Sequence, residues 1–235
     1  MKDFEWDIVS DASAVLKDLT DTTTYMCAEK SVSVSEIYPV VCGLLQNSLT
    51  RAADDSLTAG NVKDAISAEL RHRYKPSDRE TAKSVPMVAS LLDCRYKCLS
   101  FISREQKTTA REMLEFHMDE VPLRLQARDQ TEETPAKRPR LSFLVGSSTE
   151  RKSSSDELDN YMVEKSQSDV DPLVWRQQNE QRFPTIAHVA RKVLCVPATS
   201  VPSERIFSSS GLLINKLRNR LSSDIVDKII FLNKN

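Results

Sequence analysis

Side chains whose types and spacing could carry chemistry are few in this sequence. Cys94 and Cys98 are four residues apart and could share a helix face, but no second ligand pair stands near them at zinc-site spacing, and the three histidines are scattered. The serines at 208–210 lack an adjacent histidine and acid in a recognisable nucleophile motif, and no glycine-rich phosphate loop is present. We therefore expect no metal, no cofactor and no small-molecule substrate.

A short basic run lies between prolines near the middle of the chain, in the segment Pro135-Ala136-Lys137-Arg138-Pro139-Arg140. Prolines keep such a run extended and accessible, as a nuclear-import signal must be. Lys137, Arg138 and Arg140 are thus the candidate import residues. The alternative is a solvated run of charge with no receptor.

A second group of cations lies near the C-terminus, in a part of the chain where basic residues outnumber acidic ones. Lys216, Arg218 and Arg220 are candidates for contact with nucleic-acid phosphates, which would make binding depend steeply on salt. The alternative is a solvated or ion-paired turn.

The elements that must position these residues are predicted to be helices. The chain has 235 residues, of which 40% are hydrophobic, enough for one or two modest packed units. Only 4 glycines and 6% aromatic residues are present, and the ordered stretches are rich in helix formers. The cysteines are unevenly spaced, and we find neither an apolar leader nor a long apolar run. These features predict a soluble protein of a reducing, intracellular compartment.

Residues 1–127 are predicted to form successive amphipathic helices, because apolar residues recur at helical spacing. The stripes are Ile8, Ala12, Val15, Leu16 and Leu19, then Ile37, Val40, Val41, Leu44 and Leu45, then Val62, Ile66 and Leu70, the last helix starting near Gly60 and Asn61. A capping box of Ser103 and Gln106 predicts another helix start, and Val121-Pro122 predicts its end. Residues 128–170 are rich in Ser, Thr, Glu, Pro and Lys, which predicts a disordered linker.

Residues 171–235 are predicted to form several short helices. Asp171-Pro172 and Phe183-Pro184 suit helix starts, Pro202 fits the first turn of a helix that stops near Gly211, and Ser222 suits the N-cap of the last helix. A region this small can bury only part of its apolar surface alone, which predicts a partner. The residues assigned to packing or dimerisation are Trp175, Phe183, Ile186, Val189, Leu194, Ile206, Phe207, Leu221, Ile225, Ile229 and Leu232, with Ile225, Ile229 and Leu232 as the buried stripe of the last helix.

Three runs in the same region resemble the C-terminal dimerisation region of hAT-family DNA transposases. They are Phe183-Pro184-Thr185-Ile186-Ala187, Pro197-Ala198-Thr199-Ser200-Val201-Pro202-Ser203-Glu204-Arg205-Ile206-Phe207-Ser208 and Arg218-Asn219-Arg220-Leu221. The family often has an aromatic residue after the tryptophan that matches Trp175, whereas this chain has Arg176. Upstream, Leu91-Leu92-Asp93-Cys94-Arg95-Tyr96-Lys97 is similar to the Leu-Asp-Pro-Arg-Phe-Lys motif of the family's helical insertion domain, with Cys94 in place of proline.

The resemblance implies a mainly α fold with an insertion-like region at 1–127 and, at 171–235, a C-terminal helical piece that in the family completes an RNase H-like core. In that core three carboxylates hold two divalent metals for DNA cleavage and joining. Glu204 matches the third, as a vestigial catalytic residue, and we find no match here to the other two or to the family's BED zinc finger. The structural alternative is that Glu204 is favoured by the dipole of its helix. One carboxylate is too few to place a metal pair, so we expect no catalysis by this chain alone.

The sequence therefore predicts a dimerisation module of a transposase-derived nuclear protein. Its expected partners are itself or related hAT proteins, with DNA as a weak further partner and no membrane. Two alternatives stay open: a C-terminal fragment of an active hAT transposase, and a remnant of a DNA-binding transcription regulator.

Overall fold

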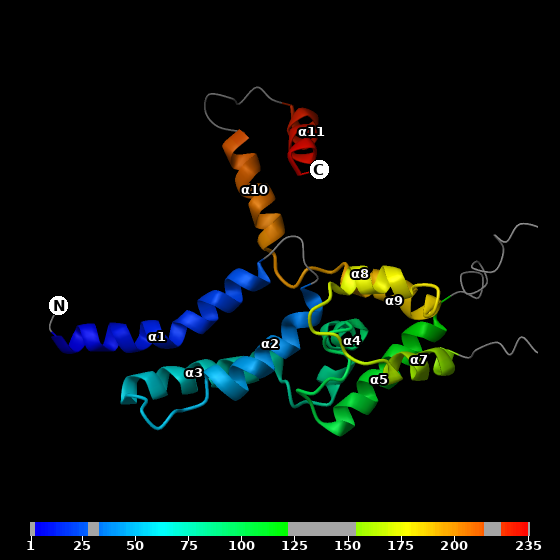
Figure 1. Ribbon diagram of the computed structural model, residues 1–235. Helices are drawn as coiled ribbons and strands as arrows, with labels where there is room; N and C mark the ends of the chain where they lie inside the picture. The colour runs from blue at the N-terminus through cyan, green and yellow to red at the C-terminus, as the bar shows by residue number, and fades with distance from the viewer. Residues whose placement is uncertain (1–2, 28–32, 122–153, 214–221, 235) are drawn as a thin grey trace, which may run out of the picture.

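The computed structural model describes residues 3–27, 33–121, 154–213 and 222–234, and within these ranges the secondary structure is helical with no strand (Figure 1). The prediction of a mainly α fold is confirmed. None of the described helices is long and apolar enough to cross a membrane.

An N-terminal layer is formed by α1 (Asp3–Met26) and α3 (Leu57–Tyr74), which lie side by side and extend away from the rest of the molecule. Val15 of α1 packs on α2 (Ile37–Gly43), η2 (Leu44–Ser48) and the start of α3 in a small apolar cluster. The predicted stripe of α1 is only partly covered, since Ile8 is 44% exposed.

The start of α3 differs from the prediction. The helix begins at Leu57, because the Ser56 hydroxyl accepts a hydrogen bond from the backbone N–H of Ala59 and caps it. Gly60 therefore lies inside the first turns. A Cβ there would stand 2.9 Å from the Arg51 guanidinium, which is the movable end of an exposed side chain, so Gly60 marks neither a tight packing point nor a helix boundary.

The main core is built around α4 (Val85–Leu92), whose Met87, Leu91 and Leu92 are at most 1% exposed. Helices η1 (Val34–Glu36), η3 (Glu80–Lys83), α5 (Arg104–Asp119) and α9 (Pro184–Leu194) pack around it. The capping box at the start of α5 forms as predicted: the Gln106 N–H donates to Ser103 Oγ over 3.3 Å, and the Ser103 N–H donates to Gln106 Oε1 over 3.2 Å. Helix α4 thus contacts helices that precede the predicted linker in the sequence and also α9, which follows it.

Helix α7 (Ser154–Val163) lies where the linker was expected. Its Leu158 and Tyr161 are fully buried against α5 and α9, so this stretch is part of the core and the predicted linker is too long at its C-terminal end. Two large apolar contacts stabilise a segment whose composition is otherwise polar, because packing against distant helices overrides local composition. Residues 128–153 lie outside the described part of the chain.

Helices α8 (Pro172–Asn179) and α9 begin where the sequence predicts. The Asp171 carboxylate accepts hydrogen bonds from the backbone N–H groups of Leu173 and Val174, which caps α8. Trp175, Phe183 and Tyr161 then meet in an aromatic cluster with ring centroids 5.6 to 6.3 Å apart. This cluster joins α7, α8 and the start of α9.

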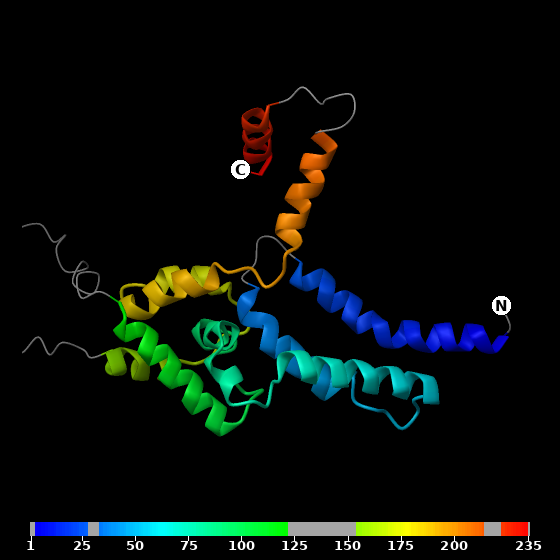
Figure 2. The same ribbon diagram turned by 180° about the vertical axis from the view of Figure 1, so that it is seen from behind.

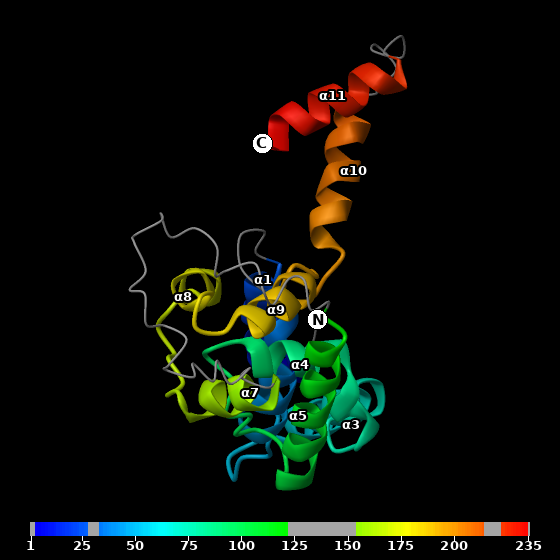
Figure 3. The ribbon, with the colours of Figure 1, turned by 90° about the vertical axis from the view of Figure 1, so that its right-hand side faces the viewer.

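The last two helices, α10 (Val201–Leu213) and α11 (Ser223–Lys234), project away from the core and contact each other (Figures 1 and 2). Figure 3, viewed from the side, shows the same separation. The helix expected to stop near Gly211 continues to Leu213. The expected burial of the stripe on α11 is wrong within one chain, because Ile225 is 46% and Leu232 76% exposed while Val226 faces inward at 6%.

Candidate functional site

The residues assigned to packing or dimerisation fall into two groups in space. The packed half comprises residues 157–194 and lies in the chain's own core. The C-terminal arm comprises α10 and α11 and lies outside it. The packed half holds five of the assigned side chains, each at most 6% exposed: Trp175, Phe183, Ile186, Val189 and Leu194. Their apolar surface is already covered by helices of the same chain.

Glu157 of α7 anchors the packed half at the start of α9. Its Oε1 accepts a hydrogen bond of 2.9 Å from the Ile186 N–H, and its Oε2 accepts one of 3.3 Å from the Thr185 N–H. The first N–H groups of a helix have no partner within the helix and favour a negative charge. Glu157 therefore supplies, from another helix, the cap that Phe183 cannot provide. Sequence reasoning missed it because Glu157 falls in the predicted linker.

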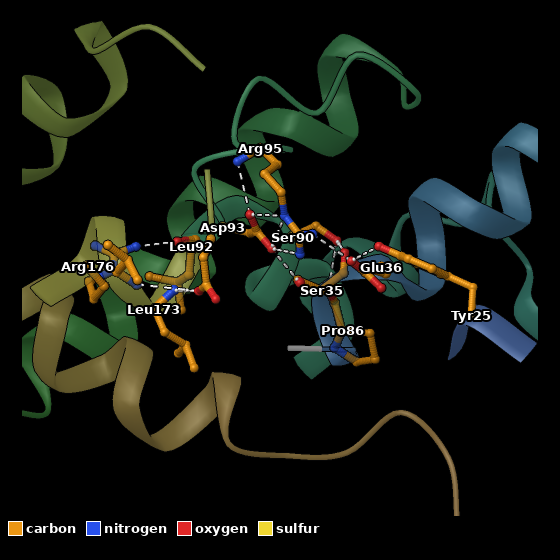
Figure 4. Close-up of polar contacts among 12 residues, drawn as sticks. Tyr25, Ser35, Glu36, Pro86, Ser90, Leu92, Asp93, Arg95, Leu173 and Arg176 are labelled. Atoms are coloured by element: carbon orange, nitrogen blue, oxygen red, sulfur yellow. Dashed lines mark hydrogen bonds and ion pairs between the residues drawn. The ribbon is translucent and has the colours of Figure 1, made fainter. Parts of the chain in front are cut away.

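The segment 91–97 contacts the packed half through its carbonyls and one lysine. Lys97 Nζ donates to the Tyr161 carbonyl over 2.7 Å, and the Tyr161 hydroxyl donates to the Leu91 carbonyl over 3.0 Å. Arg176 Nη2 donates to the Leu92 carbonyl (Figure 4). Burial lowers the pKa of Lys97 and raises the pKa of Tyr161 to about 12. Segment 91–97 is thus where the N-terminal helices contact and hold the packed half.

The other side of the same segment forms a buried ionic network with η1. Arg95 pairs with Asp93 and with Glu36, each over 2.8 Å, and the Ser35 hydroxyl donates to Asp93 over 2.6 Å. The Tyr25 hydroxyl at the end of α1 donates to Glu36 over 2.7 Å (Figure 4). Burial raises the pKa of Glu36, against the opposing effects of Tyr25 and Arg95. These contacts orient the segment and bind it to η1 and to the end of α1.

Cys94, which replaces the proline of the family motif, is fully buried, and burial raises the pKa of its thiol. Cys98 is exposed, so the two cysteines do not share a face. Among the described residues there is no group of three or more His, Cys, Asp or Glu side chains that could hold a metal ion.

The C-terminal arm presents apolar side chains to solvent. Phe207 is 74% exposed, Leu232 76% and Ile225 46%, and Ile206 at 37% is also exposed, while Ile229 is partly buried. Leu221 lies outside the described residues. The arm is therefore the part of the predicted surface that remains uncovered in this chain.

Glu204 is exposed in the first turn of α10, where its carboxylate accepts a hydrogen bond from the Ser200 hydroxyl. The Glu204 N–H in turn donates to the Ser200 carbonyl over 3.0 Å. The Glu204 carboxylate thus lies in the first turn of α10, where the helix dipole favours a negative charge. The candidate import residues Lys137, Arg138 and Arg140, and the candidate phosphate contacts Lys216, Arg218 and Arg220, lie outside the described residues.

Residues 157–235 match the sequence model of the hAT family C-terminal dimerisation region. The match covers both the packed half and the C-terminal arm, and it begins 14 residues before the predicted boundary at 171. Over residues 157–235 the chain is therefore similar to the C-terminal dimerisation region of hAT-family transposases.

Two curated relatives from Zea mays are also similar to this chain. "Putative AC transposase" and "Putative AC9 transposase" are each 38% identical to this chain over 79 residues. The aligned part is 32% of this chain but only 10% and 9% of the relatives, so the match spans about a tenth of their length.

Proposed function

We propose that this chain is a dimerisation module of a transposase-derived protein, which pairs with a second copy or with a related hAT protein through its C-terminal arm. The observation that carries the proposal is the exposure of Phe207, Ile225 and Leu232 within the matched dimerisation region. The packed half serves as the anchor that fixes the arm to the body of the molecule.

The energetics of this pairing are favourable in order of magnitude. Covering roughly 400 Å² of apolar surface on each of two chains, at about 25 cal/mol per Å², would contribute about 20 kcal/mol. Association costs about 4–15 kcal/mol in lost freedom. The arm is large enough for a stable dimer only if several of its exposed apolar side chains are covered together.

Analytical ultracentrifugation of the full chain over a concentration series tests the proposal. We expect a dimer for the wild type and monomers for Phe207→Asp and Leu232→Asp. A matched control is Leu57→Asp on α3, because Leu57 is 77% exposed and lies outside the arm. Wild-type monomers up to tens of micromolar would reject self-association, and a monomeric control variant would reject the arm as its site.

We also propose that the chain does not cleave or join DNA by itself. Two-metal phosphodiester chemistry needs several fixed carboxylates, and the Ser200 contact of Glu204 supports a structural role for that residue. Nicking of DNA in magnesium or manganese that disappears in Glu204→Gln would contradict this. That result would favour the alternative of a C-terminal piece of an active transposase.

A nuclear location completes the proposal. It rests on the relation to transposases and on the basic run, so replacing Lys137, Arg138 and Arg140 together with alanine should move a tagged protein toward the cytoplasm. An unchanged distribution would show that the basic run does not direct nuclear import. DNA binding that weakens steeply with salt would support the transcription-regulator alternative instead.

A further inference from the structure

A hollow of about 530 Å³ lies between α8 and α9 on the packed half. Leu173, Ala190 and Leu194 supply apolar lining, while Arg176, Glu180 and Arg191 are its charged residues. Leu173 is 52% exposed at the edge. The hollow is thus an apolar surface with an excess of one positive charge.

Arg176 makes the wall of this hollow unusual. The residue is 7% exposed, and it donates through Nη2 to the Leu92 carbonyl. Its Nε and Nη1 are buried and have no hydrogen-bond partner among the described residues. The rings of Trp175 and Tyr161 each lie 5.2 Å from the guanidinium carbon and offset this only in part. The Nε and Nη1 atoms are covered by the chain itself, so an occupant of the hollow would meet the charge of the guanidinium without bonding to them. Because Arg191 and Glu180 pair with each other, the net positive charge of the hollow is that of Arg176, which favours an acidic occupant.

Helix α11 has the complementary features. Ile225, Ile229 and Leu232 are spaced at i, i+4 and i+7, so they form one stripe about 10 Å long. Buried Val226 lies to one side of this stripe. On α9 the residues from Ala187 to Leu194, which line the hollow, extend over the same length. Asp224 stands exposed at the N-terminal end of the stripe and adds a negative charge beside it, which suits a positively charged hollow.

We infer that α11 of one copy docks into the α8–α9 hollow of a second copy, in a dimer where the arms are exchanged. This inference rests on the proposed self-association and names the surface that receives the arm. Within one chain α10 carries α11 away from the core over 13 residues, about 20 Å, as Figures 1 and 2 show. A two-fold axis makes the contact twice, since each copy offers one arm and one hollow.

A two-chain crosslinking experiment tests the contact directly. Cys195 lines the hollow and is exposed, and Lys228 is exposed beside the stripe of α11. One full chain carries Lys228→Cys with Cys195→Ser, and the other keeps Cys195; both carry Cys98→Ser, because Cys98 is also exposed. With a short bismaleimide, the mixture should give a covalent dimer that joins residue 228 of one chain to Cys195 of the other.

The matched control replaces Lys228→Cys with Leu57→Cys, which should give no such product. A mixture that gives no 228-to-195 product overturns the inference. So does a chain with Lys228→Cys and native Cys195 that links only within itself, because the arm then occupies its own hollow.

Sedimentation separates failure of this inference from failure of the proposed function. We expect Leu173→Asp to weaken self-association at least tenfold, while Leu57→Asp leaves it unchanged. A dimer that is lost in Leu232→Asp but intact in Leu173→Asp keeps the proposed function and overturns the hollow as the docking site. Wild-type monomers would overturn both.

Discussion

The packed half and the C-terminal arm belong to one matched region, yet they use their apolar residues in opposite ways. In the packed half Trp175 and Phe183 are covered by helices from the same chain, and the Tyr161 hydroxyl and the Glu157 carboxylate are bonded to backbone groups. In the arm Phe207 and Leu232 face solvent. An abundance of apolar residues therefore indicates that a surface must be covered, but not by which chain.

The largest effect should separate the two halves by stability. Phe183→Ala removes a buried ring from the aromatic cluster and should lower the free energy of unfolding by about 3–5 kcal/mol. Phe207→Ala should change it by no more than about 0.5 kcal/mol in the monomer, because the side chain is exposed. Urea unfolding of both variants, at a concentration where the chain is monomeric, measures the difference. Equal losses would erase the distinction between the halves.

A second, smaller effect concerns the pH dependence of stability. Burial raises the pKa of Tyr161 to about 12, above its ordinary value of 10.0, so the folded state keeps this proton at pH values where the unfolded state has lost it. The stabilisation is fully present below pH 10 and is lost as the pH rises from 10 through about 12, by roughly 2–3 kcal/mol.

Unfolding measured at pH 9 and pH 11 in wild type and Tyr161→Phe checks this expectation. The variant should lose less stability over that interval than the wild type. Phe207→Ala in the arm should retain the wild-type pH dependence, and an equal slope in all three proteins would count against a buried Tyr161.

The smallest effects should come from the helix starts of the two halves. Asp171→Ala removes the side-chain cap of α8 and should cost about 1 kcal/mol. In the monomer, Asp224→Ala in α11 removes an interaction with the helix dipole, about 0.3–1 kcal/mol at an exposed site. Hydrogen exchange of the two helices would resolve these costs locally. A larger loss of protection in α11 than in α8 would reverse the expected order.

Local signals gave the most accurate sequence predictions. The capping box at Ser103 and the Asp171-Pro172 start are confirmed because such contacts involve residues only a few positions apart. Helix α7 was missed because its stability comes from burying Leu158 and Tyr161 against helices far away in the sequence. Leu158, Tyr161 and Met162 do recur at i, i+3 and i+4, but three apolar residues in a short polar stretch do not show that a distant helix covers them.

The candidate site shows the same limit. The spacing of apolar residues correctly predicted a helix at α11. Whether these residues pack on the core of their own chain depends on the direction of α10, which the sequence does not show. Arg176 appeared as a departure from the family's aromatic, and only the structure shows it bonded to the Leu92 carbonyl between two rings. Glu157 capping α9 joins residues 28 and 29 positions apart, which no motif predicts.

The neighbouring positions of α5 and α7 have a consequence for chain connectivity. The two helices pack together and are joined by an ion pair between Arg111 and Asp159, so the connection from Val121 to Ser154 begins and ends on adjacent elements. The entropy of closing a flexible loop grows only with the logarithm of its length, about 0.6 kcal/mol for each doubling. A flexible tag inserted between Val121 and Ser154 would lengthen the path between two adjacent helices, and we expect it to cost little in stability.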